Sequence, residues 1–242
     1  MAEHERPSKT SVRKAGSKIR RFRGGEASQA EFEEALEVVR AFRSQFAGPL
    51  LMVTNSVSGI ASGCGIDASV TQRLKREQTI LEKLGDREKG LDLSRMQDIG
   101  GCRILVSDIA QVRTVEAAIL DVWEAQVAKV YDYIECPRES GYRAVHIVVK
   151  RDSLPIEIQI RSRRMHAWAE FVERMSGHFG RNLKQDAGDH PVQILARTMA
   201  EIYRLEEEQK RVPIDLIDKA NRQIAEVNKL LTASVDKQEG AS

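Results

Sequence analysis

The 242-residue chain has few cysteines and no long hydrophobic run. Its three cysteines, Cys64, Cys102 and Cys136, are widely separated and form no CxxC pair, which argues against a disulfide framework and against a zinc site. No apolar stretch reaches the roughly 18 residues of a membrane span, and the polar N-terminus lacks the apolar segment of a signal peptide. The sequence therefore predicts a cytoplasmic protein that does not enter a membrane.

Positive and negative charges nearly balance over the whole chain, because the formal net charge is only +2. The first 25 residues are the exception, since basic residues far outnumber acidic ones there. The basic residues of this segment are Arg6, Lys9, Arg13, Lys14, Lys18, Arg20, Arg21 and Arg23. We expect residues 1–25 to form a basic, partly disordered N-terminal arm that could meet a polyanion.

A helical pattern follows the arm. Ser28 and Glu31 form a capping box, and the apolar residues behind it keep helical spacing up to an expected stop at Gly48-Pro49. Residues 50–63 are apolar but interrupted by glycine and serine, which indicates a helix followed by a loop. Residues 26–67 are therefore predicted to be an N-terminal helical segment.

The central part of the chain alternates short strands with helices. Strands are expected near 68–74, at 102–107, near 126–134 and in a hairpin of 144–151 with 154–161, and helices near 77–84, near 109–124 and at 163–177. This order predicts an α+β domain with a mixed sheet over residues 68–180. Residues 190–242 then predict two helices interrupted at Pro213, which either cap the domain or form a homo-oligomer interface.

Residues 154–161, LPIEIQIR, carry the most informative pattern. Because strand side chains alternate with a period of two, the isoleucines face one side and three polar residues face the other. These polar residues are Glu157, Gln159 and Arg161. A carboxylate, an amide and a guanidinium in a row suit a metal ion and phosphate, but an edge strand with a solvated face would show the same alternation.

A second acid, Asp98, stands just before Gly100-Gly101 and the next predicted strand, where the backbone can approach a ligand closely. Two acids from different strands that converge on one point suit Mg²⁺, which prefers oxygen ligands and completes its shell with substrate phosphates. Asp98 could equally cap a turn. The pair Asp98 and Glu157 is thus a candidate magnesium site.

Other side chains that could bind a nucleotide surround these acids. Three cations could hold a polyphosphate, although a basic run is commonly only a solvated surface: Arg73, Lys75 and Lys83. Tyr142, on a predicted loop, is placed to stack on a base. His146 shares the polar side of the sheet only if the strand registers agree, and His166 either contacts a ligand or lies on a helix surface.

Four segments in this order resemble the synthetase domain of the RelA/SpoT family, in particular its stand-alone small alarmone synthetases. They are VTQRLKREQTILEKL (70–84), MQDIGGCRI (96–104), DYIECPRESGYRAVH (132–146) and EIQIRSRRMHAWAE (157–170). Four ordered motifs are far more specific together than any one of them. The resemblance implies a nucleotidyltransferase-like mixed sheet flanked by helices.

The resemblance further implies transfer of the β,γ-pyrophosphate of ATP to the 3′-hydroxyl of GDP or GTP, which makes (p)ppGpp. By motif, Asp98 and Glu157 would be the catalytic residues and would bind Mg²⁺, with Glu157 also a candidate base. The residues that would hold ATP are Arg73, Lys75, Lys83 and Arg103. Those that would bind the acceptor are Tyr142, His146, Gln159, Arg161 and His166.

Some positions depart from the common pattern of the family, which leaves the acceptor open: Tyr131, Arg138, Ala144 and Ser162. One alternative is a toxin that pyrophosphorylates the 3′ end of tRNA and is restrained by an antitoxin partner. Another is a degenerate member that only binds nucleotide or RNA. No histidine of the chain is followed by aspartate, so the hydrolase activity of the family is not expected.

Overall fold

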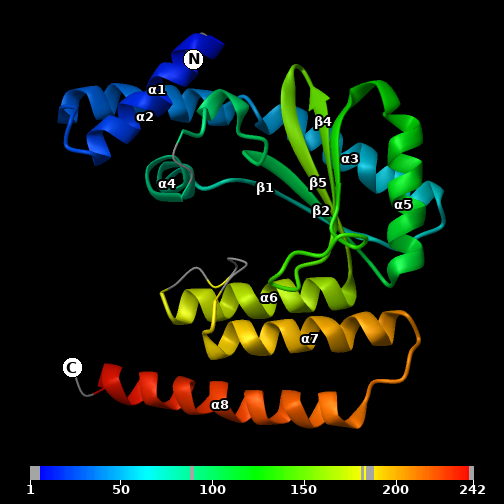
Figure 1. Cartoon of the computed structure of the whole chain (residues 1–242). Helices are drawn as coiled ribbons and strands as arrows, with labels where there is room; N and C mark the ends of the chain where they lie inside the picture. Colours follow the sequence, from blue (N-terminus) through cyan, green and yellow to red (C-terminus); the bar gives the residue numbers. More distant parts are fainter. Residues whose placement is uncertain (1–5, 88–89, 181–182, 184–187, 240–242) are drawn as a thin grey trace. The chain divides into compact units, whose positions relative to one another are not determined.

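A computed structural model describes residues 6–87, 90–180, 183 and 188–239. These residues form a mixed five-stranded sheet flanked by helices, which confirms the predicted α+β class (Figure 1). Residues 1–5 of the predicted N-terminal arm lie outside the described residues.

The chain divides into two compact units, each described by itself. The first comprises the chain through Ile104 together with Thr114–Tyr131 and His146–Gln159. The second comprises Leu105–Arg113, Asp132–Val145 and the chain from Ile160 onward.

The strands run in the order β1-β2-β5-β4-β3 across the sheet. Their bounds are β1 (Ser69–Leu74), β2 (Gly100–Val106), β3 (Val127–Asp132), β4 (Val145–Arg151) and β5 (Leu154–Ser162). Because β5 lies between β2 and β4, the edge-strand interpretation of its alternating pattern is wrong. Only Asp152 and Ser153 connect β4 to β5, and both have positive φ (49° and 65°), as a type I′ hairpin turn requires.

One face of the sheet is apolar and contributes to the core of the first unit. Its buried residues include Cys102, Ile104, Ile147, Ile156 and Ile158. The helix α3 (Ala47–Gly63) lies on this face, since Thr54 hydrogen-bonds the thiol of Cys102. Burial raises the pKa of that thiol to about 12, which keeps Cys102 protonated and unreactive.

The N-terminal helices α1 (Lys9–Arg23) and α2 (Gln29–Ser44) pack against each other. The predicted capping box of Ser28 and Glu31 is present at the start of α2. The predicted stop at Gly48-Pro49 is wrong, because α2 already ends at Ser44 and α3 runs through this dipeptide. Pro49 is tolerated there because the first turn of a helix needs no backbone N–H donor.

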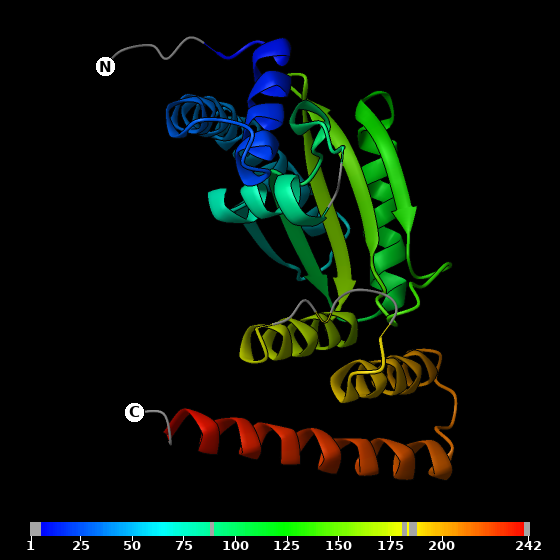
Figure 2. The same ribbon diagram turned by 60° about the vertical axis from the view of Figure 1, so that its left-hand side comes forward.

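The remaining helical elements are α4 (Glu77–Glu82), the π-helical turn η1 (Lys83–Arg87), η2 (Leu93–Arg95), α5 (Ile109–Val122), η3 (Glu124–Gln126), α6 (Arg163–His178), α7 (Pro191–Glu207) and α8 (Ile214–Glu239). Within the second unit, α6, α7 and α8 lie side by side (Figures 1 and 2). Trp168, Leu195, Ala196 and Val227 belong to their shared core, so α7 buries its apolar face inside the chain. Of the helices in the described residues, none is long and apolar enough to cross a membrane.

Two neighbouring leucines of α3 offer a matched test of this core. Leu50 is 2% exposed and Leu51 is 51% exposed. Leu50→Ala should lower the free energy of unfolding by about 2–5 kcal/mol, because it removes buried methyl groups and leaves a cavity. Leu51→Ala should change it by less than about 0.5 kcal/mol. Urea unfolding of both variants measures the difference, and equal effects would contradict the burial of Leu50.

Candidate active site

Asp98 lies just before β2, where two lysines from other segments meet its carboxylate. Lys75 Nζ donates a hydrogen bond to Asp98 Oδ2 over 2.7 Å, and Lys83 Nζ donates to the same oxygen over 3.3 Å. Lys75 directly follows β1, and its N–H donates to the carbonyl of Ile99 over 2.8 Å, which holds the end of β1 beside the segment of Asp98. The structure thus brings together one predicted acid and two predicted ATP-binding cations.

The electrostatics of this cluster keep Asp98 ionised. Burial alone would raise the pKa of the Asp98 carboxyl, but the charges and hydrogen bonds of Lys75 and Lys83 outweigh burial and hold the pKa below its usual value. The second oxygen, Oδ1, is buried and accepts no hydrogen bond from any residue that the structure describes. A buried, ionised oxygen without a donor is a position where a cation can bind.

The second acid, Glu157, is held by two neighbours on the polar face of the sheet. His146 Nδ1 of β4 lies 2.9 Å from Glu157 Oε1, and Gln159 Nε2 donates to Glu157 Oε2 over 2.7 Å. The registers of β4 and β5 therefore do agree, which the sequence left open. Burial again acts to raise the pKa of Glu157, but the contacts with His146 and Gln159 prevail and lower it.

Asp98 and Glu157 interact electrostatically. The negative charge of Asp98 opposes ionisation of Glu157, although it is a smaller influence than the two hydrogen-bonding neighbours. Gly101 faces Glu157 from the neighbouring strand β2, and a Cβ at this position would lie 3.4 Å from the Glu157 carbonyl oxygen and 4.0 Å from Oε2. A glycine here keeps space in front of the carboxylate. Arg103 lies half-buried on the same face of β2, whereas Arg73 is exposed on β1.

This donor set fits Mg²⁺. No group of three or more His, Cys, Asp or Glu that could hold a metal occurs among the described residues. Mg²⁺ commonly uses only one or two carboxylates and takes its other ligands from water and substrate phosphates. Asp98, with its buried donor-free oxygen, and Glu157 match that pattern.

The other predicted acceptor residues belong to the second unit. Arg161 is buried, and its Nη2 donates a hydrogen bond to Tyr142 Oη over 2.7 Å while the guanidinium lies 5.2 Å from the centre of the tyrosine ring. Tyr142 also packs edge to face against Trp168, with ring centres 5.9 Å apart. His166 Nε2 lies 3.4 Å from Glu170 Oε1 on the same helix, α6.

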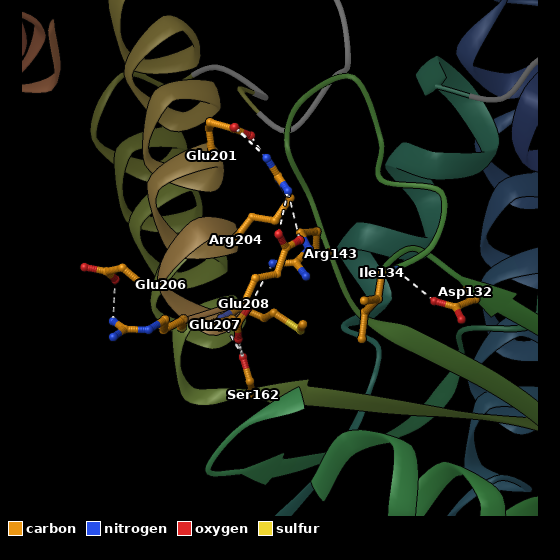
Figure 3. A network of polar contacts seen from close by, with 11 residues as sticks. Asp132, Ile134, Arg143, Ser162, Glu201, Arg204, Glu206, Glu207 and Glu208 are labelled. Atoms are coloured by element: carbon orange, nitrogen blue, oxygen red, sulfur yellow. Dashed lines mark hydrogen bonds and ion pairs between the residues drawn. The ribbon is translucent and has the colours of Figure 1, made fainter. Parts of the chain in front are cut away.

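Figure 3 shows a polar network in the second unit that the sequence patterns missed. Arg143 Nη1 donates to Glu207 Oε2 over 2.6 Å, and Ser162 Oγ donates to Glu207 Oε1. Arg143 and Ser162 directly follow Tyr142 and Arg161 in the sequence, and that adjacency is the only local signal that could have found them. Nothing in the sequence around Glu207 points to this contact.

Residues 72–176 match the sequence model of a family described as the region found in RelA / SpoT proteins. Among curated proteins, the GTP pyrophosphokinase rsh of Brucella melitensis is 32% identical over 125 residues, which are 51% of this chain and 16% of that protein. An uncharacterized protein of Mycobacterium tuberculosis is 34% identical over 128 residues, which are 52% of this chain and 45% of that protein. The chain thus spans less than half the length of either relative.

Solved structures share the fold more completely. Small alarmone synthetase 1 from Bacillus subtilis, bound to its product pppGpp, is 25% identical with a TM-score of 0.56, and the match covers 67% of this chain and 89% of that one. A GTP pyrophosphokinase family protein from Streptococcus pneumoniae is 24% identical with a TM-score of 0.53, and the match covers 74% of this chain and 95% of that one. The mixed sheet with its flanking helices is common to these proteins and this chain.

The lowered pKa of Asp98 predicts a pH-dependent stability. Asp98→Asn should destabilise the protein at neutral pH, because an amide does not compensate the charges of Lys75 and Lys83. A depressed folded-state pKa means that the ionised carboxylate adds stability above its unfolded pKa and loses it as the pH falls through the folded one. The difference in unfolding free energy between wild type and variant should therefore shrink in urea titrations from about pH 7 to about pH 3.

The exposed residue Asp121 supplies the matched control for this titration. Asp121→Asn should leave the unfolding free energy nearly unchanged across the same range. A wild-type advantage over Asp98→Asn that does not vary with pH would contradict the proposed role of the ionised carboxylate.

Proposed function

Since this chain carries a RelA/SpoT domain of the small alarmone synthetase type, we propose that it is a pyrophosphokinase that moves the β,γ-pyrophosphate of ATP to the 3′-hydroxyl of GDP or GTP. The products would be (p)ppGpp and AMP. The names of the relatives support guanine nucleotides, because one is a GTP pyrophosphokinase and another was solved with pppGpp. ATP and the acceptor are thus the partners that this proposal requires.

The observation that carries the proposal is the pair of ionised carboxylates with two lysines at one of them. Asp98 and Glu157 both have lowered pKa values, and Lys75 and Lys83 already lie at Asp98. Pyrophosphoryl transfer needs little covalent participation by the protein, because positioning and neutralisation of phosphate charge supply most of the catalysis. A bound Mg²⁺ would supply Lewis-acid charge neutralisation on the transferred phosphates.

When ATP binds, Lys75 and Lys83 would exchange the carboxylate of Asp98 for phosphate oxygens. In the structure they neutralise Asp98, and in the complex their ammonium groups would bind phosphate oxygens of ATP, with Arg73 and Arg103 as further phosphate ligands. Asp98 would then be available to the cation. The cluster is therefore assembled before substrate arrives, which reduces the reorganisation that catalysis requires.

Glu157 would act as the base for the acceptor. Its ionised carboxylate would take the proton of the 3′-hydroxyl, the freed oxygen would form a bond to the β-phosphorus, and the bond from that phosphorus to the oxygen of the α-phosphate would break. AMP would leave with that oxygen. His146 and Gln159 hold the two oxygens of Glu157, so we assign them the orientation of the base beside their predicted acceptor role.

On the acceptor side, Tyr142 would stack on the base, an interaction worth about 1–3 kcal/mol in nucleic-acid sites. The guanidinium of Arg161 is buried against Tyr142 and donates a hydrogen bond to the hydroxyl of Tyr142. Its role would therefore include fixing the ring of Tyr142 as well as attracting acceptor phosphates. His166 stays a candidate for base recognition.

The decisive assay offers purified protein Mg²⁺ and ATP labelled in the γ-phosphate, with GDP, GTP, ATP or deacylated tRNA added separately. We expect label in the guanine nucleotide and stoichiometric release of AMP, and loss of both when EDTA removes the metal. Label in tRNA alone would replace this proposal with the toxin alternative, in which an antitoxin partner is expected. No label in any acceptor, from folded protein, would favour the degenerate alternative.

A test of the basic arm with tRNA requires substitutions that remove charge without disturbing the fold. Arg20 Nη1 donates to the carbonyl of Leu91 and Arg21 Nη2 to the carbonyl of Glu26, so their replacement would disturb the fold as well as the charge. Arg13 and Lys14 are exposed on α1. Arg13→Gln with Lys14→Gln therefore removes positive charge with less structural damage, and it should leave the reaction with GDP unchanged.

Neutralising either acid should abolish transfer. Asp98→Asn and Glu157→Gln should each lower kcat by about a hundredfold or more, since each removes a charge that acts on the reacting phosphates or the attacking hydroxyl. The exposed residue Asp121 again provides the control, because Asp121→Asn should keep wild-type kcat. Circular dichroism confirms that the variants are folded, and a folded Asp98→Asn with full activity would exclude the proposed metal site.

A further inference from the structure

The second unit contains a closed ring of contacts around the acceptor residues Tyr142 and Arg161. Tyr142 is joined by a peptide bond to Arg143, and Arg161 to Ser162. Glu207 Oε2 accepts from Arg143 and Oε1 accepts from Ser162, while Arg161 donates to Tyr142 Oη over 2.7 Å. The carboxylate of Glu207, which Figure 3 shows at the end of α7 together with Arg143 and Ser162, therefore closes a ring of contacts that passes through both acceptor residues.

The ion pair of Arg143 and Glu207 within this ring is almost completely shielded from water. The side chains of Arg143 and Glu207 are 7% and 4% exposed, and their atoms approach to 2.6 Å. Removal of one partner from such a buried pair leaves an uncompensated charge, so the segment that carries the other partner must move or admit water. The position of Arg143, and with it that of its neighbour Tyr142, thus depends on Glu207.

Two further contacts join α7 to the same loop. Gly141 has φ +90°, and a Cβ at this position would lie 2.5 Å from Ala200 Cβ, so the loop can approach α7 only as glycine. Trp168, which packs on Tyr142, donates its indole N–H to the carbonyl of Ala196 over 2.7 Å. Ala196, Ala200 and Glu207 all belong to α7, which lies outside the matched residues 72–176.

From this geometry we propose that Glu207 is a positioning residue that sets the affinity for the acceptor, by fixing the loop of Tyr142 and the end of β5 at Arg161. The proposal rests on the proposed function for the identity of the acceptor and for the role of Tyr142 and Arg161 in binding it. It makes α7 a working part of the acceptor site, whereas the residues proposed to bind ATP belong to the first unit. Loss of Glu207 should therefore affect the acceptor and leave ATP binding intact.

The test compares Glu207→Gln with two control variants. Glu207→Gln should raise KM for GDP, or for whichever acceptor takes the label, by about tenfold, because small displacements of positioning groups are costly. KM for ATP should change less than about twofold. Glu208→Gln alters the next residue, which pairs with Arg204 at the surface, and should change neither constant.

Val227→Ala controls for a general loss of stability. Val227 is 3% exposed in the core of the same unit and belongs to α8. Its replacement should lower the melting temperature without raising the acceptor KM. An equal rise in acceptor KM from Val227→Ala, at a comparable loss of melting temperature, would overturn the positioning role.

A second readout does not depend on activity. The N–H groups of Gly141 and Tyr142 donate to the Arg138 carbonyl and to Ser140 Oγ, so their hydrogen exchange reports on the order of the loop. Exchange of residues 138–142 should be faster in Glu207→Gln than in Glu208→Gln. Unchanged exchange would overturn the inference, as would faster exchange in an active enzyme whose acceptor KM stays at the wild-type value.

The activity assay and the hydrogen-exchange comparison distinguish failure of the proposed function from failure of the positioning role of Glu207. If the wild type transfers label to no acceptor, the proposed function fails, and the exchange comparison still decides whether Glu207 orders the loop. If Glu207→Gln does not fold, the double variant Arg143→Met with Glu207→Leu replaces the ion pair by apolar contacts, which buried positions often tolerate. It should fold and show the same rise in acceptor KM, and a wild-type KM would overturn the proposal.

Discussion

The central position of β5 is the constraint on which the candidate site depends. Because β5 has hydrogen-bonded neighbours on both sides, its register fixes where every side chain of the strand points. Ile156 and Ile158 are completely buried on one face, and this burial holds Glu157 and Gln159 on the other. A shift of the strand by one residue would exchange the two sets. The hydrophobic core of the first unit therefore positions the carboxylate of Glu157.

The negative charges of Asp98 and Glu157 are compensated by neighbouring side chains before any ligand binds. Asp98 is paired with two lysines, and Glu157 with His146 and Gln159, so both acids remain ionised despite burial. Under the proposed function, a phosphate would replace Asp98 at the flexible lysine side chains and a cation would replace the lysines at Asp98. The lowered pKa values of the two acids are thus a consequence of these neighbouring side chains.

In the second unit, the geometry of the candidate site depends on support from another helix. The predicted acceptor residues Tyr142 and Arg161 lie on a loop and at a strand end, which are segments that hold a fixed geometry only when other elements support them. Support comes from α7, through the buried carboxylate of Glu207 and the close approach of Ala200 to Gly141. Glu207 lies 65 residues beyond Tyr142 in sequence, and the match to the family model ends before α7, so the proposed acceptor site depends on a residue outside that match.

The sequence by itself determined much of the secondary structure, although not the boundary between α2 and α3, and it determined which side of β5 is polar, because capping, periodicity and turn chemistry are local. The capping box at Ser28, the hairpin before Leu154 and the polar alternation around Glu157 all appear as predicted. It also indicated the residue types of the candidate site, through motifs in a fixed order. Tertiary structure alone decided that β5 is central, that His146 meets Glu157 and that Glu207 meets Arg143. These facts join residues distant in sequence, and the energy that selects them comes from burial and charge compensation, which no local pattern encodes.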